Sequence, residues 1–232
     1  MRDFQPLGDR GFLANFDDEA QAQGWAKEVG LRHITGILDI VLAYKTVAIH
    51  ADPDRADLEE LERLLPTISS RSSTNVSGLL LEIPVLYDGE DLSEVASKTN
   101  LSTEEIVKLH SNCDYRVQAV GFLPGFPYCG NLPPELSGLA RRASPRSRVP
   151  TGSVAIAGKQ TGIYPAESPG GWHLVGRTPL LIADIDSEFF PIEPGDRIRF
   201  SAMTKSEYQE RRGERLRSTS RGVPSDRSSW SS

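Results

Sequence analysis

Residues 152–165 read GSVAIAGKQTGIYP: the strand-like run Gly152–Gly158 enters a turn, and Gln160–Pro165 follows it. The same alternation of strand-like runs and turn residues continues outside this stretch. From Arg116 onward, short β-prone runs alternate with Gly and Pro, and no amphipathic helical segment occurs before about Lys205. This pattern predicts a compact β-barrel or sandwich in the second half of the chain.

Two short helices are predicted ahead of this β-rich part. The chain turns helical after Asp88, where Leu92 and Val95 share one face. Residues 102–105, STEE, then form a capping box, in which the first and fourth side chains satisfy each other's backbone amides. The second helix is therefore expected to present His110 at its C-terminal end.

The first 85 residues follow the order strand, helix, strand, strand, helix, strand, which is typical of a ferredoxin-like split βαβ unit. The helices start at the capping pair Asp17-Asp18 and at Asp57. Pro84 lacks the amide that a central strand needs, so the first domain ends near it. The predicted strands are Gly11–Phe16, Leu38–Tyr44, Thr46–His50 and Leu79–Leu86.

We therefore expect an α+β protein with a small α/β domain at residues 1–85 and a β-barrel domain at residues 86–210. The tail at 211–232 is rich in Arg and Ser and poor in apolar residues, so it is predicted to be disordered. The Ser- and Thr-rich stretch Ile68–Ser77 reads as a loop or hinge.

The overall composition is that of a globular protein, with 38% apolar and 25% charged residues among 232. A net charge of -6 argues against nucleic acid as a partner. No apolar stretch could cross a bilayer and no signal-peptide core follows the start, so a cytoplasmic protein without a membrane partner is expected. Cys113 and Cys129 form no Cys-x-x-Cys pair and lie near no His cluster, so no metal site is expected.

Residues 121–128, GFLPGFPY, place aromatic side chains on a backbone stiffened by two prolines. This rigid segment, which contains Phe126, is interpreted in two ways. It is either a surface on which a ligand stacks or a buried aromatic corner that seals the barrel.

An arginine-rich segment follows at residues 141–148. Arg146 and Arg148 alternate, so they share one face if the chain is extended, and their guanidinium groups suit a substrate carboxylate. Arg141 and Arg142 are interpreted instead as a solvated basic loop or an interface patch.

Further polar groups come from the segments downstream. Gln160, Thr161 and Tyr164 supply an amide and two hydroxyls that suit a neutral amide or lactam. Gly170-Gly171 beside Trp172 lets backbone amides approach a ligand oxygen, although a plain hairpin turn needs the same residues.

Two histidines, His110 and His173, are the candidate general bases near the glycine-rich region, and His110 is the stronger candidate. The chain contains no Gly-x-Ser-x-Gly elbow and no Walker-type phosphate loop. These absences count against a hydrolase or ATPase that works alone.

Three motifs in this order resemble a known family, variously labelled as the 5-oxoprolinase B subunit, allophanate hydrolase subunit 1 and sporulation-kinase inhibitor. The similarity runs from about Gly8 to Glu207. It implies a small N-terminal α/β domain followed by a cyclophilin-like β-barrel. The motifs are residues 121–128 (GFLPGFPY), 145–154 (PRSRVPTGSV) and 160–165 (QTGIYP) with 168–172 (SPGGW).

The resemblance also implies a hetero-oligomeric, ATP-binding hydrolase that converts 5-oxoproline to glutamate. The expected partners are a 5-oxoprolinase C subunit or allophanate hydrolase subunit 2-like protein and an ATP-using A subunit, with no cofactor bound by this chain. We assign catalysis to His110, Arg148 and Tyr164. Substrate binding is assigned to Phe126, Arg146, Gln160, Thr161, Gly170, Gly171 and Trp172.

Two alternatives remain open at this point. The chain could be a non-catalytic inhibitor that binds a histidine kinase through the barrel domain, with Phe126, Tyr128 and Trp172 as interface anchors. It could also be a carboxyltransferase or allophanate hydrolase-type subunit in urea metabolism.

Overall fold

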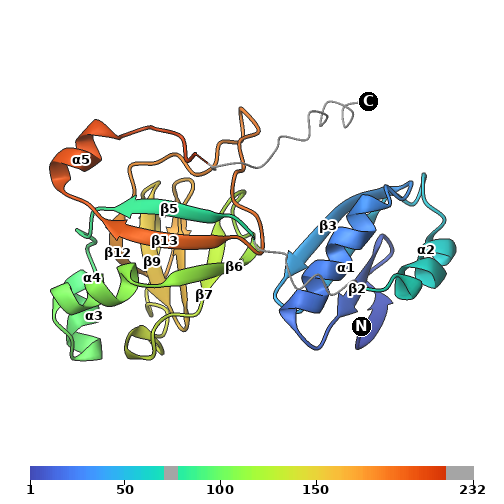
Figure 1. Ribbon diagram of the computed structural model, residues 1–232, viewed down its shortest axis with the longest axis horizontal. Coiled ribbons are helices and arrows are strands. Elements are labelled where there is room, and N and C mark those ends of the chain that lie inside the picture. The colour runs from blue at the N-terminus through green and yellow to red at the C-terminus, as the bar shows by residue number, and fades with distance from the viewer. Residues whose placement is uncertain (71–77, 218–232) are drawn as a thin grey trace.

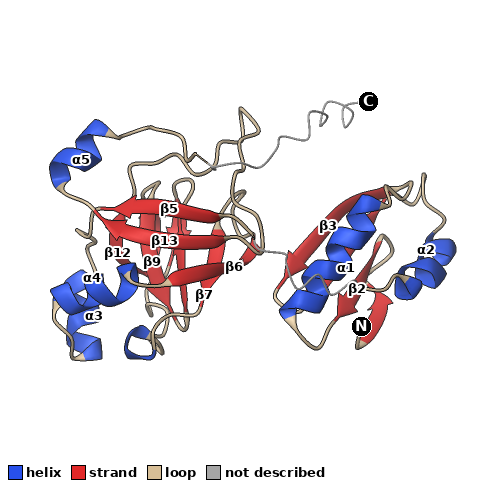
Figure 2. Ribbon diagram, viewed as in Figure 1, coloured by secondary structure: helices blue, strands red, loops and turns tan. Residues whose placement is uncertain are grey.

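Two units, each with its own hydrophobic core, lie side by side in the computed structural model (Figure 1). The structure describes residues 1–70 and 78–217. Helices and strands occur in both units, as expected for an α+β protein (Figure 2).

The N-terminal unit is an antiparallel sheet in the order β1-β2-β4-β3 with two helices. Asp18 and Asp57 cap these helices, accepting hydrogen bonds from Gln21 N at 2.8 Å and Glu60 N at 3.0 Å, as predicted. The elements are β1 (Asp3–Pro6), β2 (Gly11–Asn15), α1 (Glu19–Leu31), β3 (Ile37–Ala43), β4 (Thr46–Ala51), α2 (Leu58–Leu64) and the 3-10 turn η1 (Leu65–Thr67).

The predicted last strand of the ferredoxin-like unit belongs to the other unit instead. β5 (Leu80–Val85) pairs in parallel with β13 (Arg197–Ala202). Its side chains Leu81, Ile83 and Val85 lie in the second core. The ferredoxin-like prediction is therefore wrong in its fourth strand, and residues 80–85 pack with the C-terminal unit. Pro84 is tolerated because β5 pairs with β13 alone and so lies at the edge of the sheet, where a residue without an amide is accepted.

The C-terminal unit is built mainly from strands, in the order β5-β13-β6-β7-β10-β9-β12, and a separate two-stranded sheet pairs β8 with β11. An isolated bridge between Leu86 and Arg177 links the end of β5 to β12. The remaining elements are α3 (Leu92–Thr99), α4 (Thr103–Ser111), β6 (Asp114–Val120), β7 (Pro127–Gly130), η2 (Pro134–Leu136), β8 (Arg146–Val149), β9 (Ser153–Ala157), β10 (Gln160–Ile163), β11 (Ser168–Gly170), β12 (His173–Arg177) and α5 (Lys205–Glu210).

Local signals in this unit are confirmed. The predicted strand and turn are present: β9 pairs with β10 as a hairpin, with Gly158 at a φ of 60° in the turn. Ser102 and Glu105 make the predicted capping box at the start of α4. α4 packs against β13 and α3 packs against β12, so both helices lie against the sheet.

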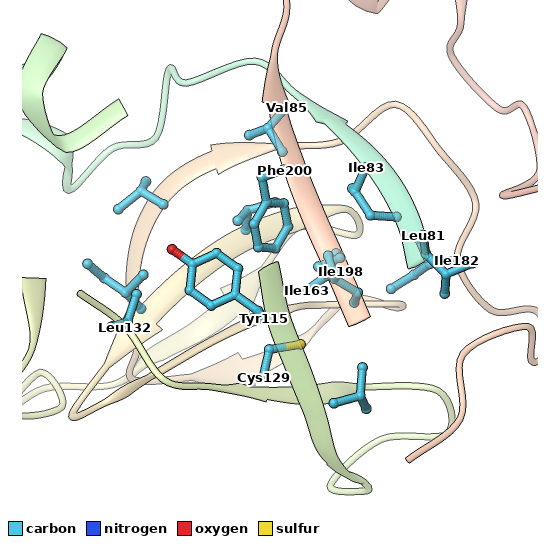
Figure 3. Close-up of a cluster of buried hydrophobic side chains, with 14 of the residues drawn as sticks. Leu81, Ile83, Val85, Tyr115, Cys129, Leu132, Ile163, Ile182, Ile198 and Phe200 are labelled. Atoms are coloured by element: carbon cyan, nitrogen blue, oxygen red, sulfur yellow. The ribbon is translucent and has the colours of Figure 1, made fainter. Parts of the chain in front are cut away.

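Apolar side chains from strands far apart in sequence fill the second core. Figure 3 shows Tyr115 of β6, Phe200 of β13 and Cys129 of β7 among them. Each fully buried large apolar side chain contributes about 1.5–3 kcal/mol to folding. This core fixes the positions of the strands that carry the loops of residues 121–128 and 164–172.

The described part of the predicted tail is ordered. Leu216 is 4% exposed and lies in the second core, and Arg215 forms a bridge with Leu181. The prediction of disorder from residue 211 is therefore wrong for 211–217, because a single apolar residue and a short backbone pairing anchor them. Residues 218–232 of that prediction, and 71–77 of the predicted hinge, lie outside the described residues.

The two units meet along β3 and β6. Ala43 pairs with Ala119, and the amide of Tyr44 donates to the carbonyl of Gln118 at 3.0 Å. Arg116 reaches across, donating to Gln23 Oε1 at 2.6 Å. One sheet thus runs through both units. In the described residues, no helix is long and apolar enough to span a membrane.

Candidate functional site

A cleft of about 210 Å3 opens on the C-terminal unit, at the loops that carry the aromatic and glycine-rich motifs. Gly170, Gly171, Arg141 and Pro145 are among the residues that line it. Most of the wall is aromatic. The rings come from Phe122, Phe126, Tyr128, Tyr164 and Trp172.

Phe126 holds the aromatic wall together. Its ring centroid lies 4.9 Å from that of Tyr128, 5.1 Å from that of Tyr164 and 5.6 Å from that of Trp172, all in edge-to-face contacts. Such pairs are favourable beyond the area they bury. Phe126 is buried while Tyr128 is half-buried, so the segment both seals the core and offers ring surface to the cleft.

Tyr164 places its hydroxyl against the backbone of Gly170. A methyl group at Gly170 would collide with that hydroxyl, so the glycine is required for this approach. Burial raises the pKa of Tyr164, and a hydrogen bond from the Trp172 backbone opposes the shift. The phenol therefore stays protonated at neutral pH and can donate a hydrogen bond into the cleft.

The guanidinium group of Arg146 is not free to bind a ligand. It makes a two-point contact with Asp91, Nη1 to Oδ2 at 2.9 Å and Nη2 to Oδ1 at 2.7 Å. Asp91 is 3% exposed and also accepts from the amide of Leu174 at 2.7 Å. Burial favours a higher pKa for Asp91, but the hydrogen bonds from Arg146 and Leu174 hold it below its usual range. This ion pair fixes the loop and is not an open binding site.

Three further polar residues of the predicted site also have partners away from the cleft. The Arg148 side chain is 75% exposed and pairs with Glu167 at 2.5 Å. Gln160 donates to the hydroxyl of Tyr44 at the junction of the two units. Thr161 is buried and donates to the carbonyl of Ala155 at 3.2 Å. Neither the predicted catalytic residue Arg148 nor the predicted binders Gln160 and Thr161 line the cleft.

His110 lies at the end of α4 as predicted, but inside the core. Its ring is 0% exposed and stacks on Phe200 at 4.6 Å. Nδ1 lies 2.7 Å from the Tyr87 hydroxyl and Nε2 lies 2.9 Å from Thr161 Oγ1. Burial lowers the pKa of His110 to about 3, so the ring is neutral in the folded protein. This placement gives no support to its predicted role as a base.

His173, the second candidate base, is buried as well. Its Nε2 lies 2.9 Å from the carbonyl oxygen of Ala140, and since a carbonyl can only accept, this nitrogen carries the proton. The contact holds the segment that leads into the cleft.

Of the two arginines interpreted as a solvated loop, Arg142 differs from that prediction and Arg141 agrees with it in its exposure. Arg142 is half-buried, with Nη1 at 2.7 Å from both Asp91 Oδ1 and Glu94 Oε2. Arg141 is exposed, as predicted, yet it lines the cleft. Sequence reasoning missed Arg141 because nothing in the local pattern separates it from its neighbours; only the folded loop turns it toward the aromatic wall.

The described residues contain no group of three or more His, Cys, Asp or Glu side chains placed to hold a metal ion. The structure thus brings together Phe126, Tyr164, Gly170, Gly171 and Trp172 of the predicted set. Of the predicted catalytic residues, only Tyr164 lies at the cleft. The arrangement can enclose a small ligand between aromatic rings and offer it the hydroxyls of Tyr128 and Tyr164 and one cation.

Comparison with known proteins identifies the family of the chain. Residues 2–190 match the family described as carboxyltransferase domain, subdomain C and D. A Bacillus subtilis (strain 168) protein, named as the B subunit of 5-oxoprolinase, is 32% identical over 228 residues, covering 88% of this chain and 94% of the relative. The Escherichia coli O157:H7 protein of the same name is 43% identical over 153 residues, covering 64% of this chain and 70% of the relative.

Solved structures share the fold of this chain. The crystal structure of TTHA0988 superposes with a TM-score of 0.75 at 40% identity, over 84% of this chain and 40% of that chain. This chain therefore spans well under half of TTHA0988. The Kluyveromyces lactis urea amidolyase, at 19% identity and a TM-score of 0.71 over 92% of this chain and 16% of that chain, shares the fold. The chain belongs to the carboxyltransferase-domain family of subdomains C and D, together with the bacterial proteins named as the 5-oxoprolinase B subunit.

Proposed function

We propose that this chain is one component of an ATP-dependent complex that opens 5-oxoproline to glutamate. The observation that carries the proposal is the near full-length similarity to the Bacillus subtilis protein named as the B subunit of 5-oxoprolinase. The name of that relative implies further subunits. The partners that we propose are a 5-oxoprolinase C subunit or allophanate hydrolase subunit 2-like protein and an ATP-using A subunit.

The C-terminal unit is proposed to be a cyclophilin-like β-barrel. Its strand order brings β5 and β12 to opposite ends of the sheet, and the bridge between Leu86 and Arg177 supports their approach. A barrel positions loops at its rim by a rigid framework, which suits a binding cleft.

The cleft is proposed to bind the lactam and orient it. Ring opening places negative charge on the carbonyl oxygen, so donors aimed at that oxygen lower the barrier. The phenol hydroxyls of Tyr164 and Tyr128, which line the cleft, are the donors proposed for that oxygen. The rings of Tyr128 and Trp172 supply an apolar wall.

The proton-transferring group is proposed to come from a partner. In the described part of the chain, none of the residues that line the cleft is a histidine, a carboxylate or a cysteine. His110 and His173 are enclosed in the core. This chain therefore holds and polarises the substrate, and activation with ATP takes place with groups that the other subunits contribute.

Co-purification with the partner subunits tests the proposal. Glutamate release from 5-oxoproline is measured with ATP for the full complex and for preparations that lack this chain. We expect release only when all subunits are present. A complex that assembles, hydrolyses ATP and leaves 5-oxoproline unchanged would contradict the proposal.

A further inference from the structure

The arginine-rich segment 141–148 contains one cation that is not neutralised. Arg142 and Arg146 both bind Asp91, and Arg148 binds the carboxylate of Glu167. Arg141 forms no ion pair within 4.0 Å with any carboxylate in the described residues 1–70 and 78–217. The one unpaired guanidinium of this segment is thus the one at the cleft.

The backbone on both sides of Arg141 is held in place. His173 Nε2 donates to the carbonyl of Ala140 at 2.9 Å, and the amide of Arg142 donates to the carbonyl of Gly171 at 2.7 Å. His173 and Gly171 both belong to the β11–β12 region, which also forms the cleft wall. The attachment point of the guanidinium is therefore fixed relative to the aromatic rings, which reduces the ordering cost of binding.

The rest of the cleft lacks a negative group. Its described lining is aromatic, glycine and proline apart from Arg141. Its volume of about 210 Å3 is below the roughly 300–1,000 Å3 of pockets for drug-sized ligands. These properties fit a small, flat molecule that carries a single negative charge.

We propose that the cleft binds a small flat monocarboxylate whose carboxylate pairs with Arg141 while its ring lies against Tyr128 and Trp172. Guanidinium offers two parallel donors that match a carboxylate. This inference deepens the proposed function and rests on it only in the choice of 5-oxoproline as the first probe. Any flat cyclic acid of similar size is a valid probe for the site itself.

Calorimetric titration of the purified full chain tests the inference with three probes: 5-oxoproline, pyrrole-2-carboxylate, and 2-pyrrolidinone, which has the lactam ring without the carboxylate. We expect at least one of the two acids to bind and 2-pyrrolidinone to bind at least about tenfold more weakly. Arg141→Gln is expected to weaken binding of the acid by roughly tenfold to a hundredfold. Arg141→Lys keeps the charge but loses the paired donors, so an intermediate affinity is expected.

Arg148→Gln is the matched control, because it removes an exposed arginine of the same segment that does not line the cleft. Its affinity for the acid is expected to stay within about twofold of the original chain. Circular dichroism confirms that each variant is folded. Equal affinities for the original chain and Arg141→Gln, or no binding of either acid up to about 10 mM, would overturn the inference.

The same variants separate this inference from the proposed function. If the complex releases glutamate and the Arg141→Gln variant leaves the KM of the complex for 5-oxoproline unchanged, the inference fails and the function stands. If the complex does not act on 5-oxoproline but the chain binds pyrrole-2-carboxylate in an Arg141-dependent manner, the function fails and the inference stands.

Discussion

At the scale of single residues, position relative to the cleft decides which polar groups can meet a ligand. Tyr164 is 2% exposed, yet its side chain lines the cleft, whereas His110 and His173 are 0% exposed and do not line it. A side chain that is buried away from the cleft and already hydrogen-bonded stabilises the fold and cannot exchange protons readily with a substrate. Contact with the cleft, more than residue type, identifies the candidate working groups.

Removal of the Tyr164 hydroxyl tests its role as a donor. Tyr164→Phe is expected to lower kcat for glutamate release by about tenfold to a hundredfold and to change KM little, because the donor acts on charge that develops in the transition state. Tyr208→Phe on α5 is the control, since that ring lies under Arg177 and outside the cleft. Equal losses of kcat in both variants would exclude a specific role for Tyr164.

The buried histidine has a defined pH signature. The unfolded chain protonates a histidine with a pKa of about 6.5, whereas burial lowers the folded pKa of His110 to about 3. The unfolded state therefore binds more protons, and this contribution to stability is lost as pH falls from about 6.5 toward 3. We expect the ring NMR signal of His110 to stay constant from about pH 8 to pH 4.

The signal is assigned by its absence in a His110→Asn variant. A titration of that signal with a midpoint near about 6.5 would show that the ring is accessible to protons, and would restore His110 as a candidate base.

The sequence alone could not identify which arginine lines the cleft. The sequence indicated a carboxylate-binding arginine within residues 141–148, but it favoured Arg146 and Arg148 over Arg141. Asp91 neutralises Arg146, and Asp91 lies on a different part of the chain, at the start of α3. Which arginine remains unpaired is therefore a property of tertiary contacts.

At the scale of elements, local rules predicted the starts of the helices and the turn after residues 152–158 well. Capping residues fixed the starts of α1, α2 and α4, and the turn at Gly158 joined β9 to β10. The partner of β5 could not be predicted, because β13 lies at the far end of the chain and parallel pairing leaves no mark on the local pattern. The error in the first domain follows from that one strand.

The close approach of Tyr164 to β11 predicts a sharp contrast between two glycines. Gly170→Ala is expected to lower the free energy of unfolding by about 1–3 kcal/mol, because the added methyl group collides with the Tyr164 hydroxyl. Gly121→Ala adds a methyl group where no atom lies within 4 Å, so its effect is expected to stay within about 0.5 kcal/mol. Urea denaturation measures both, and a Gly170→Ala variant as stable as Gly121→Ala would contradict this packing.

At the scale of the whole molecule, the N-terminal unit is tied to the unit that carries the cleft. Arg116 of β6 donates to Gln23 and lies 3.5 Å from Glu19, and both partners belong to α1. Gln160, on a strand beside the cleft, donates to Tyr44 of the β3–β4 turn. These contacts place the N-terminal unit against the strands that support the site.

Hydrogen exchange tests the strength of this junction. Arg116→Gln is expected to speed exchange of the Tyr44 amide, which donates to Gln118 across the junction, by about threefold to tenfold. Amides within the β2–β4 pairing are expected to exchange at unchanged rates. Arg199→Gln, which removes a surface arginine paired with Asp114 at the N-terminal end of β6, is the control. Unchanged exchange at Tyr44 in Arg116→Gln would mean that the two units hold together without this arginine.

The location of the bound substrate is the most direct test of the account. A crystal structure of the assembled complex with 5-oxoproline is predicted to show the ligand against Tyr128 and Trp172, with its carboxylate within hydrogen-bonding distance of Arg141. A ligand bound entirely by other subunits, with this cleft facing away from it, would contradict the account.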